Sequence, residues 1–185
     1  MLVAVSIIET LLPPAFATYR EWEDWVERLM RLGVTEEYTR IWWDVRPHPK
    51  LGTLEIRIPD QPTDVHLSAA FTALLQALCA AALDGVLPRN SSVLGDRGRA
   101  DYVQNRWSAA RFGPRAKLLH PDGQSYVLAS ELAAELFELV RPAARTLGGE
   151  AFVDRLDPST CEADLQLQRA TAQEAAADVV ARSVG

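Results

Sequence analysis

The sequence contains little lysine and little cysteine. Only two of its 19 basic residues are lysines, and 25 acidic residues give a formal net charge of −6 at pH 7. A nucleic-acid binder neutralises phosphates with a net basic surface, so this balance argues against that class of function. Its two cysteines, Cys79 and Cys161, make neither a disulfide framework nor a metal-binding pattern. We therefore expect a protein of the reducing cytoplasm.

Long hydrophobic runs are also missing. The longest apolar stretch, residues 69–83, is interrupted by Thr72 and Gln76 and is shorter than the roughly 20 helical residues that cross a bilayer. We therefore expect no membrane span. With 48% apolar and 24% charged residues over 185 positions, the composition is typical of one compact globular domain.

Two segments carry strong helix signals. Thr18 and Glu21 form a capping box before residues 19–32, whose apolar spacing predicts a helix that ends at Gly33. The predicted core face of this helix is Trp22, Trp25, Val26, Leu29 and Leu32. Residues 65–83 form the second predicted helix, capped by Thr63 or Asp64; it is apolar on nearly every side, which predicts burial against a sheet or another layer.

The rest of the chain is mostly helical in pattern. Helices are predicted over residues 100–112, 130–146 and 163–180. Residues 87–99 are rich in proline, serine, glycine and arginine, which predicts a loop and makes this segment the best candidate for a lid.

Residues 40–46 and 53–58 alternate in polarity and are joined by the Pro- and Gly-punctuated segment 47–52. This pattern predicts a β-hairpin. Because side chains alternate across a strand, one face of the hairpin is apolar and faces the core. The other face carries two carboxylates and two guanidiniums, from Asp44, Arg46, Glu55 and Arg57.

This charged face has two interpretations. Carboxylate oxygens hold Mg²⁺ at about 2.1 Å, and the planar arginine fork meets phosphate oxygens, so the face suits a polyanion bound with a metal. Alternatively, it is a solvated sheet face whose cross-strand ion pairs contribute roughly 0.2 to 1 kcal/mol each. The alternation alone favours the solvated face, since antiparallel sheets commonly expose one side.

The hairpin segment is also where the sequence resembles a known family. Residues 39–58 contain the run Trp-Trp-Asp-Val-Arg-Pro-His-Pro and, after Leu51, Gly-Thr-Leu-Glu-Ile-Arg-Ile, with Asp60 and Gln61 following. This run resembles the carboxylate-amine ligases of the glutamate-cysteine ligase type 2 family. The resemblance extends to residues 13–16 and the following helix, and to residues 105–113, 139–144 and 147–148, so that it covers about residues 13–169, most of the chain.

The resemblance implies an α+β chain with part of a glutamine-synthetase-like catalytic fold, in which an antiparallel hairpin or sheet is covered by apolar helices. It implies ATP as a substrate and Mg²⁺ as a cofactor. In that chemistry ATP phosphorylates the γ-carboxylate of glutamate, and the amine of cysteine displaces phosphate to give γ-glutamylcysteine. Metal ions and guanidiniums neutralise the transferring phosphoryl group, and a closed site keeps water from the acyl phosphate.

Residue roles follow from the same resemblance. The Glu-x-Arg pair of the wider superfamily falls on Glu55 and Arg57, which makes Glu55 a Mg²⁺ ligand and Arg57 a contact of the transferred phosphate. Arg46, on the neighbouring strand, is a second candidate for a substrate carboxylate or phosphate, and Asp44 is a candidate to orient it.

Three further residues are weaker candidates for substrate or nucleotide binding. His48 lies between two prolines in the predicted loop, where a lone histidine is more often structural. Asn105 and Arg106 lie in the second family-like segment, where capping or ion pairing competes with nucleotide contact.

Residues 1–12 do not resemble the family, so residues 13–185 are interpreted as the carboxy-terminal half of a ligase domain. Half a metal site is a poor catalyst, which leaves two hypotheses. One is an enzyme for glutamate, cysteine or another amine, and ATP, active once another chain completes its site. The other is a non-catalytic remnant or a subunit of a split ligase that acts as a binding module. An uncovered sheet edge and apolar face predict a homo-oligomer or a complementing chain. The net charge and the short apolar runs predict neither nucleic acid nor a membrane as a partner.

Overall fold

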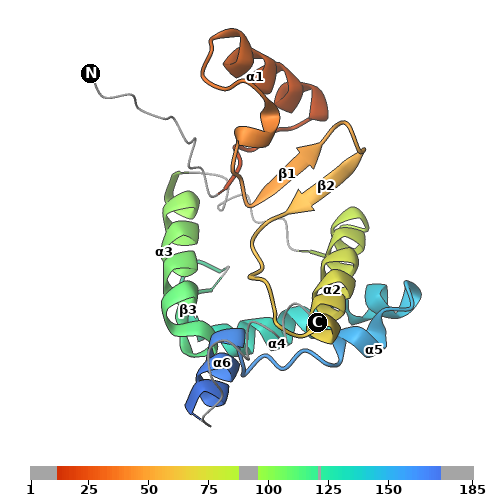
Figure 1. Ribbon diagram of the computed structural model, residues 1–185, viewed down its shortest axis with the longest axis vertical. Coiled ribbons are helices and arrows are strands. Elements are labelled where there is room, and N and C mark those ends of the chain that lie inside the picture. The colour runs from red at the N-terminus through yellow and green to blue at the C-terminus, as the bar shows by residue number, and fades with distance from the viewer. Residues whose placement is uncertain (1–11, 88–95, 121, 172–185) are drawn as a thin grey trace. The chain divides into compact units, whose positions relative to one another are not determined.

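The computed structural model describes residues 12–87, 96–120 and 122–171 (Figure 1). The chain divides into two compact units, Met1–Asp60 and Gln61–Gly185, where the composition predicts one. Pro59 and Pro62 flank the boundary, and no helix or strand lies between Ile56 and Val65. Proline lacks a backbone N–H and restricts the residue before it, so this link forms no secondary structure that would merge the units.

The first unit begins with helix α1, Tyr19–Arg31. The Thr18 hydroxyl accepts a hydrogen bond from the Glu21 N–H at 3.2 Å, and the Ala17 N–H donates to the Glu21 carboxylate at 2.9 Å. The Thr18 cap confirms the predicted start of the helix, although the Glu21 carboxylate accepts from Ala17 and not from Thr18 itself. Gly33, with φ of 70°, follows its end in a conformation that glycine adopts without strain.

Helix α1 packs on the segment that precedes the hairpin. Trp22 and Val26 share a core with Tyr38 of the 3-10 helix η1 (Tyr38–Arg40) and with Ile41 and Trp43, against which Phe16, Trp25 and Leu29 pack from partly buried positions. Leu32, predicted to join this face, is 62% exposed, because the helix ends one residue before it.

The hairpin consists of strands β1, Val45–His48, and β2, Thr53–Ile56, paired antiparallel with Arg46 opposite Glu55. The prediction of a first strand over residues 40–46 is wrong at both ends. Arg40 ends η1, and β1 continues through Pro47 and His48. A two-stranded sheet has only edge strands, which tolerate a proline that cannot donate to a ladder.

Burial of the two hairpin faces differs from the expectation. Arg46 and Glu55 lie on the same face, as the alternation predicts. However, Asp44 and Arg46 are only 4% and 5% exposed, whereas Leu54 and Ile58 are each 51% exposed. The expected orientation, apolar face to the core, is therefore wrong for β2, because the core of this unit is built by α1 and the residues before β1.

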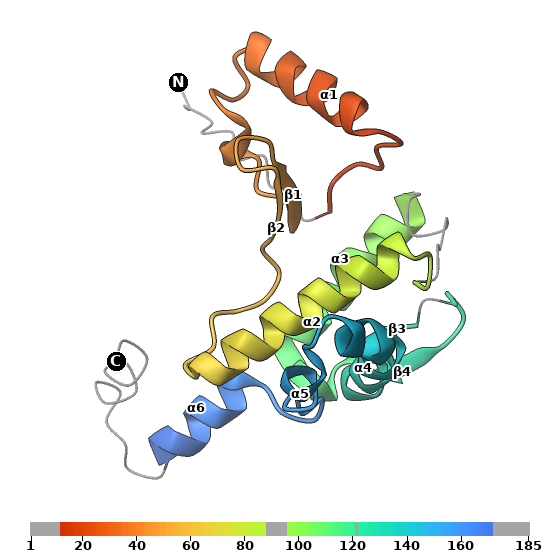
Figure 2. The ribbon, with the colours of Figure 1, turned by 90° about the vertical axis from the view of Figure 1, so that its right-hand side faces the viewer.

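The second unit is built around helix α2, Val65–Leu83, whose predicted bounds are confirmed. Asp64 caps it by accepting from the His66 N–H at 2.8 Å. Figure 2 shows α2 beside α4 (Ala129–Thr146) and α5 (Glu150–Val153). The shared core consists of Ala70, Leu74, Ala77, Ala81, Val140, Ala144, Val153 and Leu156. By length and composition alone α2 could cross a membrane, but its small residues pack here on other helices.

The remaining elements complete the α+β composition. Helix α3, Asp96–Phe112, begins earlier than predicted and ends just before the expected glycine. That glycine is the first residue of the 3-10 helix η3, Gly113–Arg115. A second hairpin pairs β3, Lys117–Leu119, with β4, Tyr126–Leu128. Helix α6, Glu162–Thr171, follows α5. Most of the predicted lid, residues 88–95, and the end of the last predicted helix lie outside the described residues.

Candidate functional site

Three charged side chains meet on one face of the β1–β2 hairpin, and we call Arg46, Glu55 and Arg57 the hairpin cluster. Arg46 donates from Nε and Nη2 to Oε2 of Glu55 at 3.0 and 2.5 Å. Arg57 donates from Nη1 to Oε1 of the same carboxylate at 2.8 Å. Each carboxylate oxygen thus faces a different guanidinium. The local cause is the strand register, because Arg46 is opposite Glu55 and Arg57 follows two residues later on the same side.

Arg46 is the buried member of the hairpin cluster, with a side chain 6% exposed. Its Nη1 donates to the carbonyl oxygens of Thr39 and, at 3.0 Å, of Ile41. Together with the two bonds to Glu55, these contacts engage every nitrogen of the guanidinium. Arg46 therefore ties the turn before β1 to strand β2.

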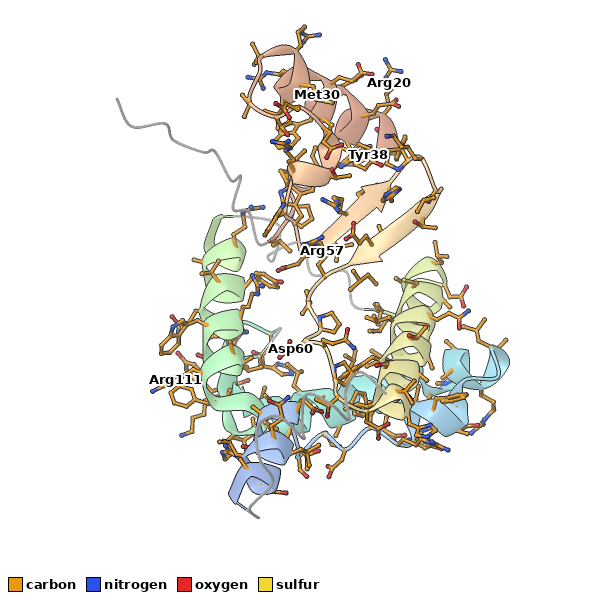
Figure 3. The ribbon with its side chains drawn as sticks, in the orientation of Figure 1. Arg20, Met30, Tyr38, Arg57, Asp60 and Arg111 are labelled. Carbon is orange, nitrogen blue, oxygen red and sulfur yellow. The ribbon has the colours of Figure 1, made fainter. Side chains whose placement is uncertain are left out.

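Arg57 is the accessible member, with a side chain 35% exposed. It lies just past the end of β2 (Figure 3), where its backbone N–H donates to the Asp44 carbonyl at 2.7 Å and extends the pairing of the strands. Its guanidinium carbon lies 5.5 Å from the ring centroid of Trp42. Within the described part of the chain, Nε and Nη2 of Arg57 have no hydrogen-bond partner, so this edge of the guanidinium is available to an anion.

The pKa of Glu55 is below its ordinary value. Partial burial raises the pKa of this carboxyl, but the hydrogen bonds and charges of Arg46 and Arg57 outweigh burial and lower it. Glu55 is therefore ionised at neutral pH, and its carboxylate forms ion pairs with both guanidiniums.

Magnesium does not fit the hairpin cluster as it stands. Mg²⁺ takes six oxygen ligands in a near-octahedral shell, and within the described residues no three His, Cys, Asp or Glu side chains gather into a metal site. Glu55 is a single carboxylate with a guanidinium on each oxygen, and those cations repel a second one. We therefore assign no step of the chemistry to a metal held by these residues.

Asp44 and His48 also lie on the hairpin. Asp44 is 4% exposed. His48 is a strand residue rather than a loop residue, and both of its ring nitrogens lie 3.4 Å from the Tyr38 hydroxyl, with the two rings perpendicular and 5.4 Å apart. Contact with Tyr38 gives His48 a structural role; a binding role for either residue stays a prediction.

Asn105 and Arg106 belong to α3 of the second unit. The Asn105 amide donates to the Leu119 carbonyl at 2.9 Å and accepts from the Leu119 N–H at 2.7 Å. Both ends of the amide are thus engaged in attaching α3 to β3. Arg106 is half-buried, and its role in nucleotide binding stays a prediction, as does that of Asn105.

Sequence reasoning missed Trp42. The alternation places Trp42 on the same side as Asp44 and Arg46, but its neighbour Trp43 is the core residue, at 1% exposure, whereas Trp42 is 55% exposed. The available signal was a large aromatic residue on the predicted charged face, two positions before Asp44.

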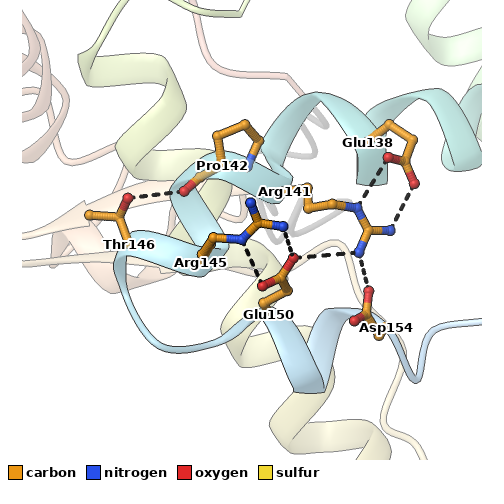
Figure 4. A network of polar contacts seen from close by, with 7 residues as sticks. All are labelled: Glu138, Arg141, Pro142, Arg145, Thr146, Glu150 and Asp154. Carbon is orange, nitrogen blue, oxygen red and sulfur yellow. Dashed lines mark hydrogen bonds and ion pairs between the residues drawn. The ribbon is translucent and has the colours of Figure 1, made fainter.

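A second charged cluster joins α4 to α5 (Figure 4), and we call it the α4–α5 network. Arg141 contacts Glu138 at 2.7 Å and also Asp154, and Arg145 contacts Glu150 at 2.6 Å. The guanidiniums lower the pKa of Glu138 and of Glu150. The Arg145 and Glu138 side chains are each 69% exposed, so the network lies in water.

A surface cavity of about 400 Å³ lies beside α6, lined by Arg115 of η3, Ser159 and Thr160, and four residues of the helix. Arg115 forms a two-pronged ion pair with Asp164, at 3.0 and 3.3 Å, which raises the pKa of Arg115 and lowers that of Asp164. No residue of the predicted site lines this cavity. Among the described residues that line the cavity, the two charged side chains, Arg115 and Asp164, pair with each other.

Comparison with known proteins gives a consistent result. The family model described as glutamate-cysteine ligase family 2 matches residues 8–181. A Rubrobacter xylanophilus protein named "Putative glutamate--cysteine ligase 2-3" is 45% identical over 140 residues, which are 76% of this chain and 36% of that protein. A Herpetosiphon aurantiacus protein named "Putative glutamate--cysteine ligase 2" is 33% identical over 84% of this chain and 40% of its own length.

The chain therefore spans about two fifths of the length of these relatives. The family model, in contrast, covers nearly all of this chain, including the hairpin cluster and the α4–α5 network. The chain belongs to glutamate-cysteine ligase family 2.

Proposed function

We propose that this chain carries the phosphoryl-binding part of an ATP-dependent carboxylate-amine ligase that joins glutamate to cysteine. The γ-carboxylate of glutamate attacks the terminal phosphorus of ATP and releases ADP. The amine of cysteine then attacks the acyl phosphate, phosphate leaves, and the amine loses a proton as the amide of γ-glutamylcysteine forms. Family membership supports the reaction class, and the hairpin cluster supports the location.

The accessible edge of Arg57 carries this proposal. A transferring phosphoryl group needs positive, preorganised donors more than covalent chemistry, and arginine presents a planar set of N–H groups that is always charged. Arg57 is the member of the hairpin cluster that is both exposed and held in place. In this proposal it is the catalytic residue, because its Nε and Nη2 touch the phosphoryl oxygens.

Arg46 and Glu55 then act through Arg57. Arg46 is bonded to Glu55 and to two backbone carbonyls, so it fixes the carboxylate instead of meeting the substrate. Glu55 in turn fixes Nη1 of Arg57. We propose both as positioning residues, in place of the substrate contact of Arg46 and the magnesium ligation by Glu55 that the family resemblance implies.

We propose a glutamine-synthetase-like arrangement for the complete site, glutamate, cysteine and ATP as its small-molecule substrates, Mg²⁺ accompanying ATP, and the cytoplasm as its location. The chain's short span relative to its relatives supports a site completed by further residues, on another chain or on a longer one.

Binding of ATP tests this proposal on the chain itself. Arg57→Gln removes one charge-assisted contact, worth about 1.5 to 3 kcal/mol, so we expect ATP affinity to fall roughly 10- to 100-fold by titration calorimetry. Arg155→Gln is the matched control, because Arg155 also lies over an aromatic ring, 5.8 Å from the centroid of Phe152, but outside the hairpin. Equal ATP affinity for the chain and Arg57→Gln would contradict the proposal.

Turnover is the second readout. We expect glutamate- and cysteine-dependent ADP release when the chain is mixed with the part of the Rubrobacter xylanophilus relative that it does not match, and loss of that release in Arg57→Lys. Lysine keeps the charge but not the planar fork. ATP binding without turnover in the mixture would favour a binding module over an enzyme.

A further inference from the structure

We propose that Trp42 is a positioning residue that holds Arg57 for contact with a phosphoryl oxyanion. This inference rests on the proposed function, since it assigns a role to Trp42 through Arg57. No family motif used above gives Trp42 a role; the assignment comes from the contact between the indole and the guanidinium.

The exposure of Trp42 is the first observation. Its neighbours Ile41 and Trp43 are 1% exposed and fill the core of the first unit, whereas Trp42 is 55% exposed. A tryptophan that leaves half its surface in water contributes little to that core. Its neighbour across the hairpin is the guanidinium of Arg57, at 5.5 Å from the ring centroid.

The geometry of the contact is the second observation. A guanidinium held over an aromatic ring uses its flat face and leaves its in-plane N–H groups unoccupied. Nη1 of Arg57 is already taken by Glu55 at 2.8 Å. The carboxylate thus holds Nη1, the guanidinium carbon lies over the indole ring, and the edge formed by Nε and Nη2 remains for an oxyanion.

Holding Arg57 at two points reduces the conformational entropy that its side chain loses when an anion binds. A free arginine side chain samples many rotamers, and binding an anion requires it to adopt one of them. The guanidinium of Arg155 lies over Phe152 but has no hydrogen bond or ion pair among the described contacts, so this side chain is held from one side only. Arg57 is held from two, so less ordering remains when the anion binds.

The first experiment observes the contact without any ligand. Protons above an indole face are shifted upfield by the ring current, so the side-chain Nε–H signal of Arg57 in an NMR spectrum reports on Trp42. We expect Trp42→Leu to move this signal downfield and Trp42→Phe to retain part of the shift. Trp107→Leu removes another exposed tryptophan, 59% exposed, and should leave the signal in place. An unchanged Arg57 signal in Trp42→Leu would overturn the inference.

The second experiment measures ATP affinity. A cation–π contact at an exposed site predicts that Trp42→Leu weakens ATP binding about threefold to fivefold, with Trp42→Phe recovering most of the loss. In an Arg57→Gln background Trp42→Leu should cause no further loss, which a general structural role would not predict. The thermal midpoint of Trp42→Leu should stay close to that of the unmodified chain.

The two proposals fail in different ways. If the unmodified chain does not bind ATP, the proposed function is wrong, and so is the anion-binding role of Trp42, even where the NMR signal confirms the contact. If the chain binds ATP and Trp42→Leu binds it equally well, or if the loss persists in the Arg57→Gln background, the proposed function stands and the role of Trp42 is wrong.

Discussion

The hairpin cluster and the α4–α5 network both consist of guanidiniums and carboxylates, but they differ in the ratio of these groups and in their exposure to water. In the hairpin, two guanidiniums share the single carboxylate of Glu55, and Arg46 is 6% exposed. In the network, two guanidiniums face three carboxylates, and every side chain in its ion pairs is 29% or more exposed. Guanidiniums therefore outnumber carboxylates in the hairpin cluster, and carboxylates outnumber guanidiniums in the α4–α5 network.

This difference separates a candidate site from a surface feature. Exposed ion pairs contribute little, because water and salt screen them and long side chains lose entropy in forming them. A buried guanidinium requires full pairing, and Arg46 has it, which leaves Arg57 as the hairpin cluster's outward contact. In the proposed function, the exposure of Arg57, rather than the mere presence of an arginine, is therefore what marks the residue that contacts the anion.

The largest effect should come from Arg46→Met. The change leaves the ionised Glu55 beside one guanidinium instead of two and leaves the Thr39 and Ile41 carbonyls without their donor. Removing one partner of a buried pair costs about 3 kcal/mol at the lower end of the usual range. Tryptophan fluorescence during urea unfolding measures it, since four of the five tryptophans lie in the first unit.

Arg141→Met is the matched control for that comparison. Arg141 also contacts three residues, Glu138, Glu150 and Asp154, but on the helix surface. We expect a much smaller fall in the unfolding midpoint, followed by circular dichroism because the second unit is mainly helical. Equal losses for Arg46→Met and Arg141→Met would remove the distinction between the two clusters.

Acid should act on the hairpin through Glu55. Its folded pKa lies below the ordinary value of 4.5, so its ion pairs stabilise the fold fully above pH 4.5, and this contribution disappears as the pH falls through the lowered pKa. Glu55→Gln should therefore lower the urea midpoint at pH 7, by less than Arg46→Met does. The gap between Glu55→Gln and the unmodified chain should narrow below pH 4.5; a gap that stays constant down to pH 2 would exclude this linkage.

The smallest effect is the response to salt. At about 1 M NaCl the Debye length is near 3 Å, so exposed pairs are screened while buried ones are affected much less. The stability loss of Arg141→Met should shrink toward zero in this salt, and the loss of Arg46→Met should persist. Urea titrations of both variants at low and high salt make the measurement, and a salt-sensitive Arg46→Met would indicate a hairpin cluster open to water.

The elements predicted best are those with local signals. The bonds that cap α1 and the Asp64 cap of α2 join residues within four positions of one another, and both helices begin as predicted. The first strand was misplaced because its alternation begins at Arg40, whereas the chain forms η1 there and enters the strand only at Val45. A short 3-10 turn followed by extended residues has no periodicity that distinguishes it from a longer strand.

The candidate site was predicted in part. Period-two alternation placed Arg46, Glu55 and Arg57 together, and the register confirms that Arg46 faces Glu55. Which of the two arginines is buried did not follow from alternation, because both occupy equivalent positions in the pattern. Nor did the engagement of Asn105, whose partner Leu119 is 14 residues away and reaches it only through the packing of β3 on α3.

The sequence by itself determined the longer helices but not α5, the presence of the β1–β2 hairpin, the shared face of Glu55 and Arg57 and the family. Those features depend on spacings of two to four residues and on a continuous run of motif residues, both of which can be recognised in the sequence without a structure. The tertiary structure decided the division into two units, the burial of Arg46 and the position of Arg57 over the Trp42 ring. Burial and side-chain contacts depend on which surfaces meet, and those surfaces are set by many distant contacts that no local spacing encodes.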